Sequence, residues 1–224
     1  YYWAHEIAKK YELSLIEKDI TPVLEKMDCY KGTVGYLSRN KLINRIALRS
    51  IPYLIHNYPY YLTLKKTDQQ TINQAIAFFR LKHRVRMAAL YQFAERNGFL
   101  VAGCLNRSEL LTGFYVPYGD NAADMAPTIN LYKTEAQLLA RHLQLPRGII
   151  EKAPSPDLLP GIEDERVLGT SYRNLDRLLV GLEKGLSVEE LSTAAGLPLK
   201  TVKNIEKIVS LAEKLQMAMP VPDL

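Results

Sequence analysis

The chain has 224 residues, 47% of them apolar, and its 29 lysines and arginines against 24 acidic residues give a formal charge of +5. That apolar content supports a hydrophobic core and excludes a disordered or low-complexity chain, while the small positive charge suits an anionic ligand without requiring one. Two cysteines exclude a disulfide framework and a cysteine-built zinc site, and the lack of any apolar stretch near ~18–20 residues predicts a cytoplasmic protein with no membrane partner.

The first residues are typical of the middle of an α/β unit. Trp3 and Ile7 predict the later part of an amphipathic helix, and the apolar residues 13–16 predict a short strand. A second helix is expected from Thr21, with Asp19 or Thr21 as its cap. Because a sheet seldom lacks its first strand, we expect the sequence to begin within a fold whose first βα unit is missing.

Residues 28–70 predict no regular element. They contain the tyrosine-rich run at residues 58–61 and a basic series at Arg39, Lys41 and residues 45–49. We interpret them as a divergent insertion or a subunit surface with solvated cations. A nucleic-acid groove is less favoured, because basic spacing alone specifies little.

The central part of the chain predicts a helix, a strand and a second helix in succession. Apolar residues recur at spacings of three and four over residues 71–97, and Gly98 ends this helix. Residues 99–103 are short, apolar and bounded by glycines, which predicts a buried strand. A short helix through residues 109–111 follows after a turn, and a loop is expected at residues 118–124.

The C-terminal half is predicted to be helical. We expect a helix over residues 131–143 closed by Pro146, a rigid connection over residues 154–161, and a helical stretch capped by Asp164. Residues 187–219 predict a pair of helices with the spacing of a helix-turn-helix. Only three of its lysines would face a phosphate backbone, so helix packing is favoured and no nucleic-acid partner is expected.

Acidic residues that could hold a metal follow the predicted strand. Glu109, Asp120 and Asp124 would lie beyond its carboxyl end, where open α/β sheets bind ligands. Magnesium takes one or two carboxylates together with phosphate oxygens, which this arrangement could provide. The alternatives stay open, because an acid in the first helical turn is favourable on its own and aspartates also form turns.

Lys133 is a candidate for a phosphate contact. It is near the start of its predicted helix, where the macrodipole disfavours a cation by ~0.3–1 kcal/mol unless an anion binds there. A solvated lysine is the common alternative, and Ser155, between two prolines, could equally cap or turn the chain. Cys104 could be a nucleophile by position, but the four histidines are scattered, so a small buried thiol is favoured. No glycine-rich phosphate loop is present.

Seven motifs follow one another over roughly residues 76–180, and their order and spacing are specific although no single motif is. They are Lys82-His83-Arg84-Val85-Arg86-Met87, Val101-Ala102-Gly103-Cys104, Ser108-Glu109-Leu110, Tyr118-Gly119-Asp120-Asn121-Ala122-Ala123-Asp124, Leu131-Tyr132-Lys133-Thr134, Pro154-Ser155-Pro156-Asp157, and Asp164-Glu165 with Tyr172 and Asp176. This series, close to half of the chain, resembles the NAD synthase family of ATP-dependent amidating ligases. A weaker match covers residues 1–27 and the tail.

The resemblance implies an adenine-nucleotide α-hydrolase-like (Rossmann-like) α/β fold, with a parallel sheet, flanking helices and a helical C-terminal tail, working as a homodimer. It assigns residues 1–180 to the ligase domain, with residues 28–70 as an insertion or dimer surface, and residues 181–224 to the helical tail. It also implies the reaction. The nicotinate carboxylate of deamido-NAD attacks the α-phosphorus of ATP, giving an adenylate and pyrophosphate, and ammonia then displaces AMP to form NAD.

The resemblance further implies roles for six residues and a need for ATP and Mg²⁺. It matches Glu109 to the magnesium carboxylate, Lys133, Ser155 and Cys104 to ATP contacts, and Arg84 and Asp124 to deamido-NAD contacts. Cys104 stands where the family has a threonine, and a thiol is a weaker hydrogen-bond partner than a hydroxyl. No residue is assigned to the chemical step itself.

The sequence departs from the family in three places. The family's Ser-Gly-Gly phosphate loop, with its magnesium-binding aspartate, does not occur in the 224 residues. Pro117 replaces a substrate-binding lysine, and Lys214-Leu215-Gln216 replaces the usual His-Lys-Arg of the tail. We therefore predict an NAD-synthase-like ligase that shows negligible amidation as this chain alone. Two alternatives stay open: a paralogue that adenylates another carboxylate, and a non-catalytic nucleotide-binding or dimer module.

Overall fold

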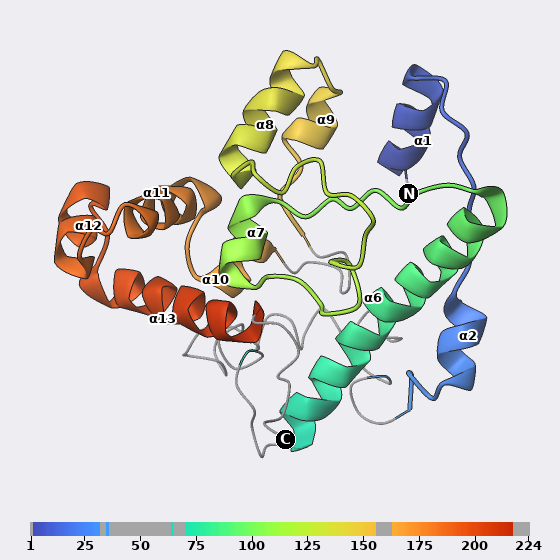
Figure 1. Cartoon of the computed structure of the whole chain (residues 1–224), viewed down its shortest axis with the longest axis horizontal. Coiled ribbons are helices and arrows are strands. Elements are labelled where there is room, and N and C mark those ends of the chain that lie inside the picture. The colour runs from blue at the N-terminus through green and yellow to red at the C-terminus, as the bar shows by residue number, and fades with distance from the viewer. Residues whose placement is uncertain (1, 32–34, 36–63, 65–69, 156–162, 217–224) are drawn as a thin grey trace, which may run out of the picture.

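The computed structural model describes residues 2–31, 35, 64, 70–155 and 163–216, which are mostly helical (Figure 1). Most of the region 28–70, including the predicted basic series and tyrosine-rich run, lies outside the described residues, as does the second half of the proline-rich connection. Across the described part, no helix combines the length and the apolar character that crossing a membrane requires.

Two short helices open the chain. They are α1 (Tyr2–Lys10) and α2 (Thr21–Lys26), and α2 begins where the sequence predicts. The predicted cap is wrong, because Ile20 stands at the N-cap without a side-chain bond, although Asp19 Oδ1 accepts from Thr21 N at 2.8 Å. The predicted strand at residues 13–16 is wrong, because that segment is irregular and its apolar side chains are largely exposed. A strand needs a partner strand for its backbone groups, whereas Leu13 N donates locally to the carbonyl of Ala8, at 2.8 Å.

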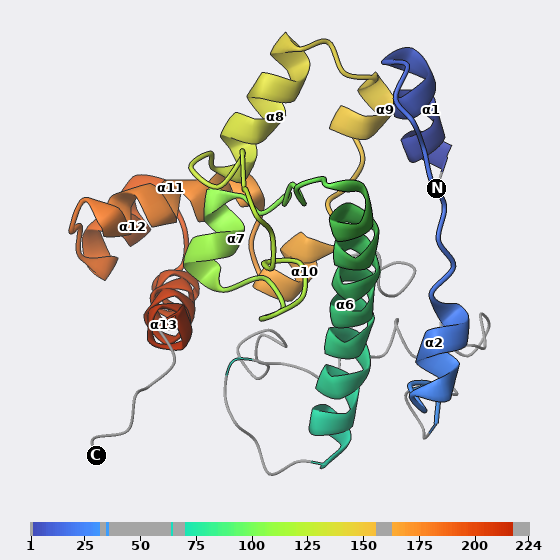
Figure 2. The ribbon, with the colours of Figure 1, turned by 45° about the vertical axis from the view of Figure 1, so that its right-hand side comes forward.

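The long helix α6 (Gln70–Asn97) confirms the predicted helix and its end at Gly98, which has a φ of +66°. A left-handed residue after the last turn is the usual helix terminator, and glycine adopts it without steric cost. The buried positions of α6 include Phe78, which packs against Leu24 of α2, and Ala94 nearer the C-terminal end. Figure 2 shows α2 lying alongside α6.

The predicted buried strand at residues 99–103 is reduced to one parallel bridge between Ala102 and Met125. Phe99 and Leu100 are 60% and 73% exposed, so the expectation of a buried strand is wrong for this end of the segment. A strand needs backbone partners along its length, and the described residues supply a partner at one position. The parallel sheet expected for the fold is represented in the described residues by this bridge alone.

Three helices follow, and two of them confirm predicted helices. These are α7 (Arg107–Thr112) and α8 (Lys133–His142), and α9 (Arg147–Ile150) comes after the proline that was expected to close α8. A Cβ added at Gly148 of α9 would lie 2.0 Å from a ring carbon of Trp3. Gly148 therefore lets the Trp3 ring lie directly against α9, and any larger residue there would displace that ring.

The C-terminal part contains α10 (Asp164–Leu168), α11 (Tyr172–Glu183), α12 (Val188–Ala195) and α13 (Leu199–Gln216). The helical stretch expected from residue 164 is divided into α10 and α11 at Gly169, whose φ is +78°. The prediction of Asp164 as its cap is wrong, because Asp164 is the first helical residue and Glu163 stands at the N-cap. The predicted terminal helix pair is confirmed as α12 and α13. Figure 1 shows α13 crossing below α7, and α11 and α12 beside it.

The largest core joins α10, α11, α12 and α13. It includes Val188 and the ring of Tyr172, and most of its members are fully or nearly fully buried aliphatic side chains: Leu168, Leu175, Leu178, Leu179, Leu191, Val202, Ile205 and Ile208. Each such side chain contributes ~1.5–3 kcal/mol relative to an exposed one. Leu111 of α7 and Tyr132 just before α8 pack on this core, so the core fixes the two helices on which the candidate site is built.

Candidate functional site

Asp176 of α11 joins three helices through its buried carboxylate, which is 4% exposed. Its Oδ1 accepts a hydrogen bond from Ser108 Oγ of α7 at 2.5 Å, and its Oδ2 accepts from Thr134 N and Oγ1 of α8 at 2.8 and 2.7 Å. Ser108 Oγ in turn accepts from Lys133 N at 2.9 Å. Because the first N–H groups of a helix lack intrahelical acceptors, these bonds both satisfy α8 and fix its N-terminus against α7.

This junction brings Glu109 and Lys133 together. Lys133 Nζ lies 3.3 Å from Glu109 Oε1, and the two side chains are 24% and 16% exposed. Glu109 is also part of a capping box, in which Glu109 N donates to Asn106 Oδ1 at 3.0 Å and Asn106 N donates to Glu109 Oε2 at 3.2 Å. One carboxylate oxygen therefore serves the helix cap, while the other faces the lysine.

Tyr172 forms one wall beside this ion pair. Lys133 Nζ lies 5.2 Å from the centre of the Tyr172 ring, and the Tyr172 hydroxyl donates to Asp164 Oδ2 at 3.1 Å. Burial raises the pKa of Tyr172 above its ordinary value, and the carboxylates of Asp164 and Glu109 raise it further. Tyr172 therefore stays a protonated hydroxyl, which can donate to Asp164 but cannot supply a base.

Magnesium fits this arrangement only with help from a substrate. Within the described ranges, no three His, Cys, Asp or Glu side chains are grouped so that they could hold a metal ion. Magnesium is commonly held by one or two carboxylates, several waters and substrate phosphates, rather than by a cage of protein ligands. Glu109 is suited to a site shared with substrate phosphates, because the described residues hold its Oε1 only through the ion pair with the partly exposed Lys133.

The predicted deamido-NAD contacts, Arg84 and Asp124, meet at the loop that follows α7: Arg84 bonds to this loop from α6, and Asp124 belongs to it. Arg84 Nε donates to the Pro117 carbonyl at 3.1 Å. Asp124 Oδ2 accepts from Val101 N at 2.7 Å, and its Oδ1 accepts from the Tyr91 hydroxyl at 3.2 Å. Both side chains are exposed, and both hold the loop of residues 115–124 to the rest of the chain. Their proposed contact with substrate stays a prediction.

The two other predicted ATP contacts are Cys104 and Ser155. The thiol of Cys104 is free and exposed, so the interpretation of Cys104 as a small buried thiol is wrong. Cys104 is in the short irregular segment between the Ala102 bridge and the cap of α7, which leaves its side chain at the surface. Ser155 is half-buried at the end of a described stretch. The ATP-contact roles of both stay predictions.

The altered tail of the family pattern also reaches the site region. Gln216 Nε2, at the end of α13, donates to the carbonyl of Leu110 in α7 at 2.5 Å. Where the family has a run of cations, this chain therefore has a neutral amide bonded to the helix that carries Glu109.

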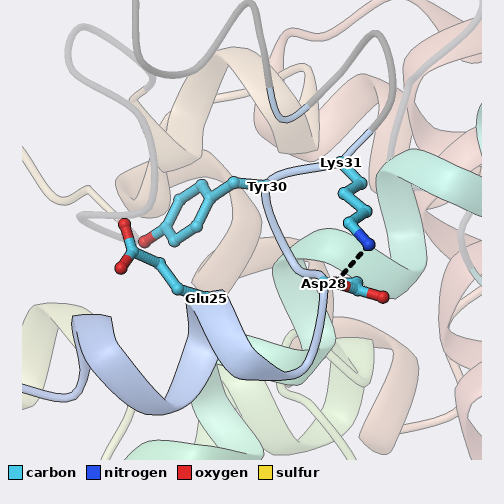
Figure 3. Close-up of a pocket in the computed structure, with 4 residues that line it drawn as sticks. All are labelled: Glu25, Asp28, Tyr30 and Lys31. Atoms are coloured by element: carbon cyan, nitrogen blue, oxygen red, sulfur yellow. Dashed lines mark ion pairs between the residues drawn. The ribbon is translucent and has the colours of Figure 1, made fainter.

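Among the described residues, a groove beside the site and a pocket far from it are both lined by residues other than Glu109 and Lys133. A groove of about 580 Å³ runs along α11 and α12, and Thr134, Asp176, Arg173 and Arg177 are among its lining residues. A smaller pocket of about 220 Å³ lies at the end of α2. Figure 3 shows its four lining residues, among them the ion pair between Asp28 and Lys31 at 2.8 Å.

Sequence reasoning missed the role of Asp176 and its partners. Ser108 and Thr134 are next to Glu109 and Lys133 in the sequence, but nothing in the sequence indicated that their hydroxyls bond to Asp176. One signal was available. Asp176 stands next to Leu175 on the stripe that also includes Tyr172 and Leu179, and a carboxylate in an apolar stripe indicates buried hydrogen-bond donors.

Comparison with known proteins gives a consistent result. The sequence model of NAD synthase matches residues 37–218. An NH₃-dependent NAD⁺ synthetase from Thermotoga maritima is 38% identical over 206 residues, which cover 92% of this chain and 71% of that protein. A protein of the same name from Coprothermobacter proteolyticus is 48% identical over 143 residues, covering 64% of this chain and 48% of that protein.

Two solved structures are also similar. NMN synthetase from Francisella tularensis has a TM-score of 0.68 and 20% identity, covering 100% of this chain and 72% of that one, a likeness that concerns the fold alone. NH₃-dependent NAD synthetase from Campylobacter jejuni has a TM-score of 0.50 and 25% identity, covering 82% and 73% of the two chains. The family model and the named relatives define a carbon–nitrogen ligase. The chain belongs to the NAD synthase family.

Proposed function

We propose that this protein catalyses the ATP-dependent amidation of deamido-NAD to NAD with ammonia, through an acyl-adenylate and with release of AMP and pyrophosphate. A free carboxylate is a poor acyl donor at neutral pH, because its leaving group would be an oxide. Transfer of the AMP group to the nicotinate carboxylate gives the acyl carbon a good leaving group, which ammonia displaces. The alternatives of another carboxylate substrate and of a non-catalytic module are not favoured by the named relatives.

The observation that carries this proposal is the pairing of Glu109 with Lys133 on two helices that Asp176 ties together. Lys133 is the first residue of α8, where the helix dipole opposes its charge. In the absence of an anion, the carboxylate of Glu109 compensates that charge. A nucleotide phosphate would do so more fully, since it accepts from the ammonium group and from helix N-terminal groups alike.

In this proposal, Lys133 binds phosphate oxygens of ATP, and Ser155 and Cys104 contribute further ATP contacts. Glu109 would hold magnesium, which when bound offsets negative charge on the phosphates. When ATP binds, Lys133 turns from Glu109 to the phosphates, and the carboxylate becomes available to the metal. The hydrogen bonds of Asp176 keep both backbones in place during that exchange, so little reorganisation is needed at the reacting end.

Arg84 on α6 and Asp124 in the loop of residues 115–124 are proposed to contact deamido-NAD. Pro117 offers neither charge nor donor where the family has a lysine, so Arg84 carries more of the phosphate recognition in this chain. Its Nε is bonded to the Pro117 carbonyl, which leaves the other guanidinium nitrogens as donors.

We also propose a homodimer and a division into a ligase domain (residues 1–180) and a helical segment (residues 181–224). Phe93, Phe99 and Leu100 are 40%, 60% and 73% exposed, and the first two rings lie 6.2 Å apart, which supports a covered apolar surface in the assembled protein. Light scattering coupled to gel filtration of the complete gene product tests this, since a monomeric mass would contradict the dimer.

The reaction itself is tested by incubating the product of the complete gene with deamido-NAD, ATP, magnesium and an ammonium salt. We expect NAD and pyrophosphate to form in equal amounts, and no NAD to form when ATP is omitted. Nicotinic acid mononucleotide, which lacks the adenylate half of deamido-NAD, serves as the matched control substrate. Formation of pyrophosphate with another carboxylic acid but not with deamido-NAD would overturn the proposed substrate.

A further inference from the structure

His83 of α6 is a buried imidazole that the proposed reaction does not use. It is 7% exposed, and its Nδ1 has no hydrogen-bond partner among the described residues. The carboxylate oxygen Oδ2 of Asp120 lies 3.8 Å from that nitrogen, which is beyond hydrogen-bond distance. Buried polar atoms are almost always bonded, because an unmade bond costs stability, so this nitrogen requires an explanation.

The imidazole lies directly beneath the turn formed by residues 116–120. Asp120 Oδ1 accepts from Val116 N at 2.7 Å, so the aspartate is already fixed to the turn by its other oxygen. A Cβ added at Gly119 would lie 2.9 Å from the Cβ of His83, which shows how closely the backbone covers the histidine. A shift of the turn by less than an ångström toward α6 would bring Asp120 into hydrogen-bond range.

A hydrogen bond between Asp120 and His83 would require one particular tautomer of the imidazole. A carboxylate only accepts hydrogen bonds, so Nδ1 must carry a hydrogen for the bond to form. Burial lowers the pKa of His83, the carboxylate of Asp120 raises it, and the guanidinium of Arg86 lowers it again. The net decrease favours a neutral ring at pH 7. A bond to Asp120 then requires the tautomer that carries its hydrogen on Nδ1.

The same turn connects the two residues proposed to contact deamido-NAD. Arg84, which follows His83 on α6, donates to the carbonyl of Pro117 within the turn. Asp124 ends the segment and bonds to Val101 N. Movement of this turn toward His83 would therefore also move the backbone from Pro117, to which Arg84 bonds, to Asp124.

We propose that His83 is a positioning residue for the dinucleotide. Its Nδ1–H donates to Asp120 when the segment of residues 116–124 closes on deamido-NAD, and this bond holds Arg84 and Asp124 in register. The inference rests on the proposed function, because it assigns the segment to the deamido-NAD side of that site. His83 itself touches neither substrate.

Steady-state kinetics of the complete gene product test the inference with matched variants. His83→Leu replaces the imidazole with an apolar side chain of similar size that has no donor. It should raise the KM for deamido-NAD about fivefold while changing kcat and the KM for ATP less than about twofold. His83→Asn places an amide N–H near the position of Nδ1 and should restore a KM close to that of the wild type. His142→Asn, at an exposed histidine of α8, is the control.

The outcomes separate the inference from the function. A wild type that forms no NAD overturns the proposed function. A wild type that forms NAD, with a His83→Leu variant whose KM for deamido-NAD is unchanged, overturns the inference alone. Should His83→Leu not fold, ¹⁵N NMR of the wild type decides, because deamido-NAD should give a neutral ring protonated at Nδ1. A ring protonated only at Nε2 with deamido-NAD bound would overturn the inference.

Discussion

Lys133 Nζ and Glu109 Oε1 lie 3.3 Å apart although the residues are 24 positions apart and belong to different helices. The ion pair is not held by its own attraction, since a partly exposed pair contributes little. It exists because Asp176 and Ser108 fix the start of α8 against α7. Lys133 and Glu109, which would touch a nucleotide, are thus positioned by Asp176 and Ser108, which would not.

Replacing Asp176 by asparagine should therefore destabilise the protein by ~2–3 kcal/mol, because an amide NH₂ replaces one of two buried oxygens that accept from Ser108 and Thr134. Urea unfolding followed by circular dichroism measures the change. Thr134→Val removes a single hydroxyl donor and should cost about 1 kcal/mol. A variant Asp176→Asn with wild-type stability would show that the junction is not structurally important.

The contact between α1 and α9 can be followed with Trp3, which is the one tryptophan in the sequence. In Gly148→Ala, the new methyl group would meet the Trp3 ring, so we expect the ring to move outward and its fluorescence to shift to longer wavelength. Arg147→Ala, on the same short helix, is the control and should leave the emission unchanged. Unchanged emission in Gly148→Ala would argue against the packing of α1 on α9.

The acid sensitivity of the fold should depend on His83. Burial lowers the pKa of His83 below its ordinary value of 6.5, so below about that pH the unfolded chain binds a proton more strongly than the folded chain does. Stability therefore falls as the pH decreases from about 6.5 toward the folded pKa, and above that range this group contributes no pH dependence.

Urea unfolding of wild type and His83→Leu at about pH 8 and about pH 5.5 tests this. The wild type should lose more stability between the two values than the variant, and the exposed-site variant His142→Asn should behave as the wild type does. Equal losses in wild type and His83→Leu would contradict a buried, neutral His83.

The elements that the sequence predicts correctly are those whose signals are local. The end of α6 at Gly98 and the helix pair α12 and α13 depend on apolar spacing and on glycine, which are independent of distant residues. The two predicted strands, at residues 13–16 and 99–103, are not formed as expected. Strand formation needs backbone partners elsewhere in the chain, and apolar composition alone does not supply them.

The same distinction applies to the site. The resemblance to the family indicated Glu109 and Lys133, and the structure brings those two side chains together. It could not indicate that Asp176 holds the two helices, because Ser108 and Thr134, whose groups bond to Asp176, come from different parts of the chain. The orphan nitrogen of His83 is likewise a product of packing and has no sequence signal.

The central claim is that Lys133 and Glu109 form one site for the phosphates of ATP, and ATP affinity measured by calorimetry tests it most directly. Lys133→Met should weaken binding of ATP in magnesium by about tenfold or more, since a charge-assisted hydrogen bond is lost, whereas Lys184→Met, at the exposed residue that follows α11, should have no effect. Glu109→Gln should weaken binding in magnesium but not in its absence, where loss of the negative charge frees Lys133 for the phosphates. Wild-type ATP affinity in Lys133→Met would contradict the account.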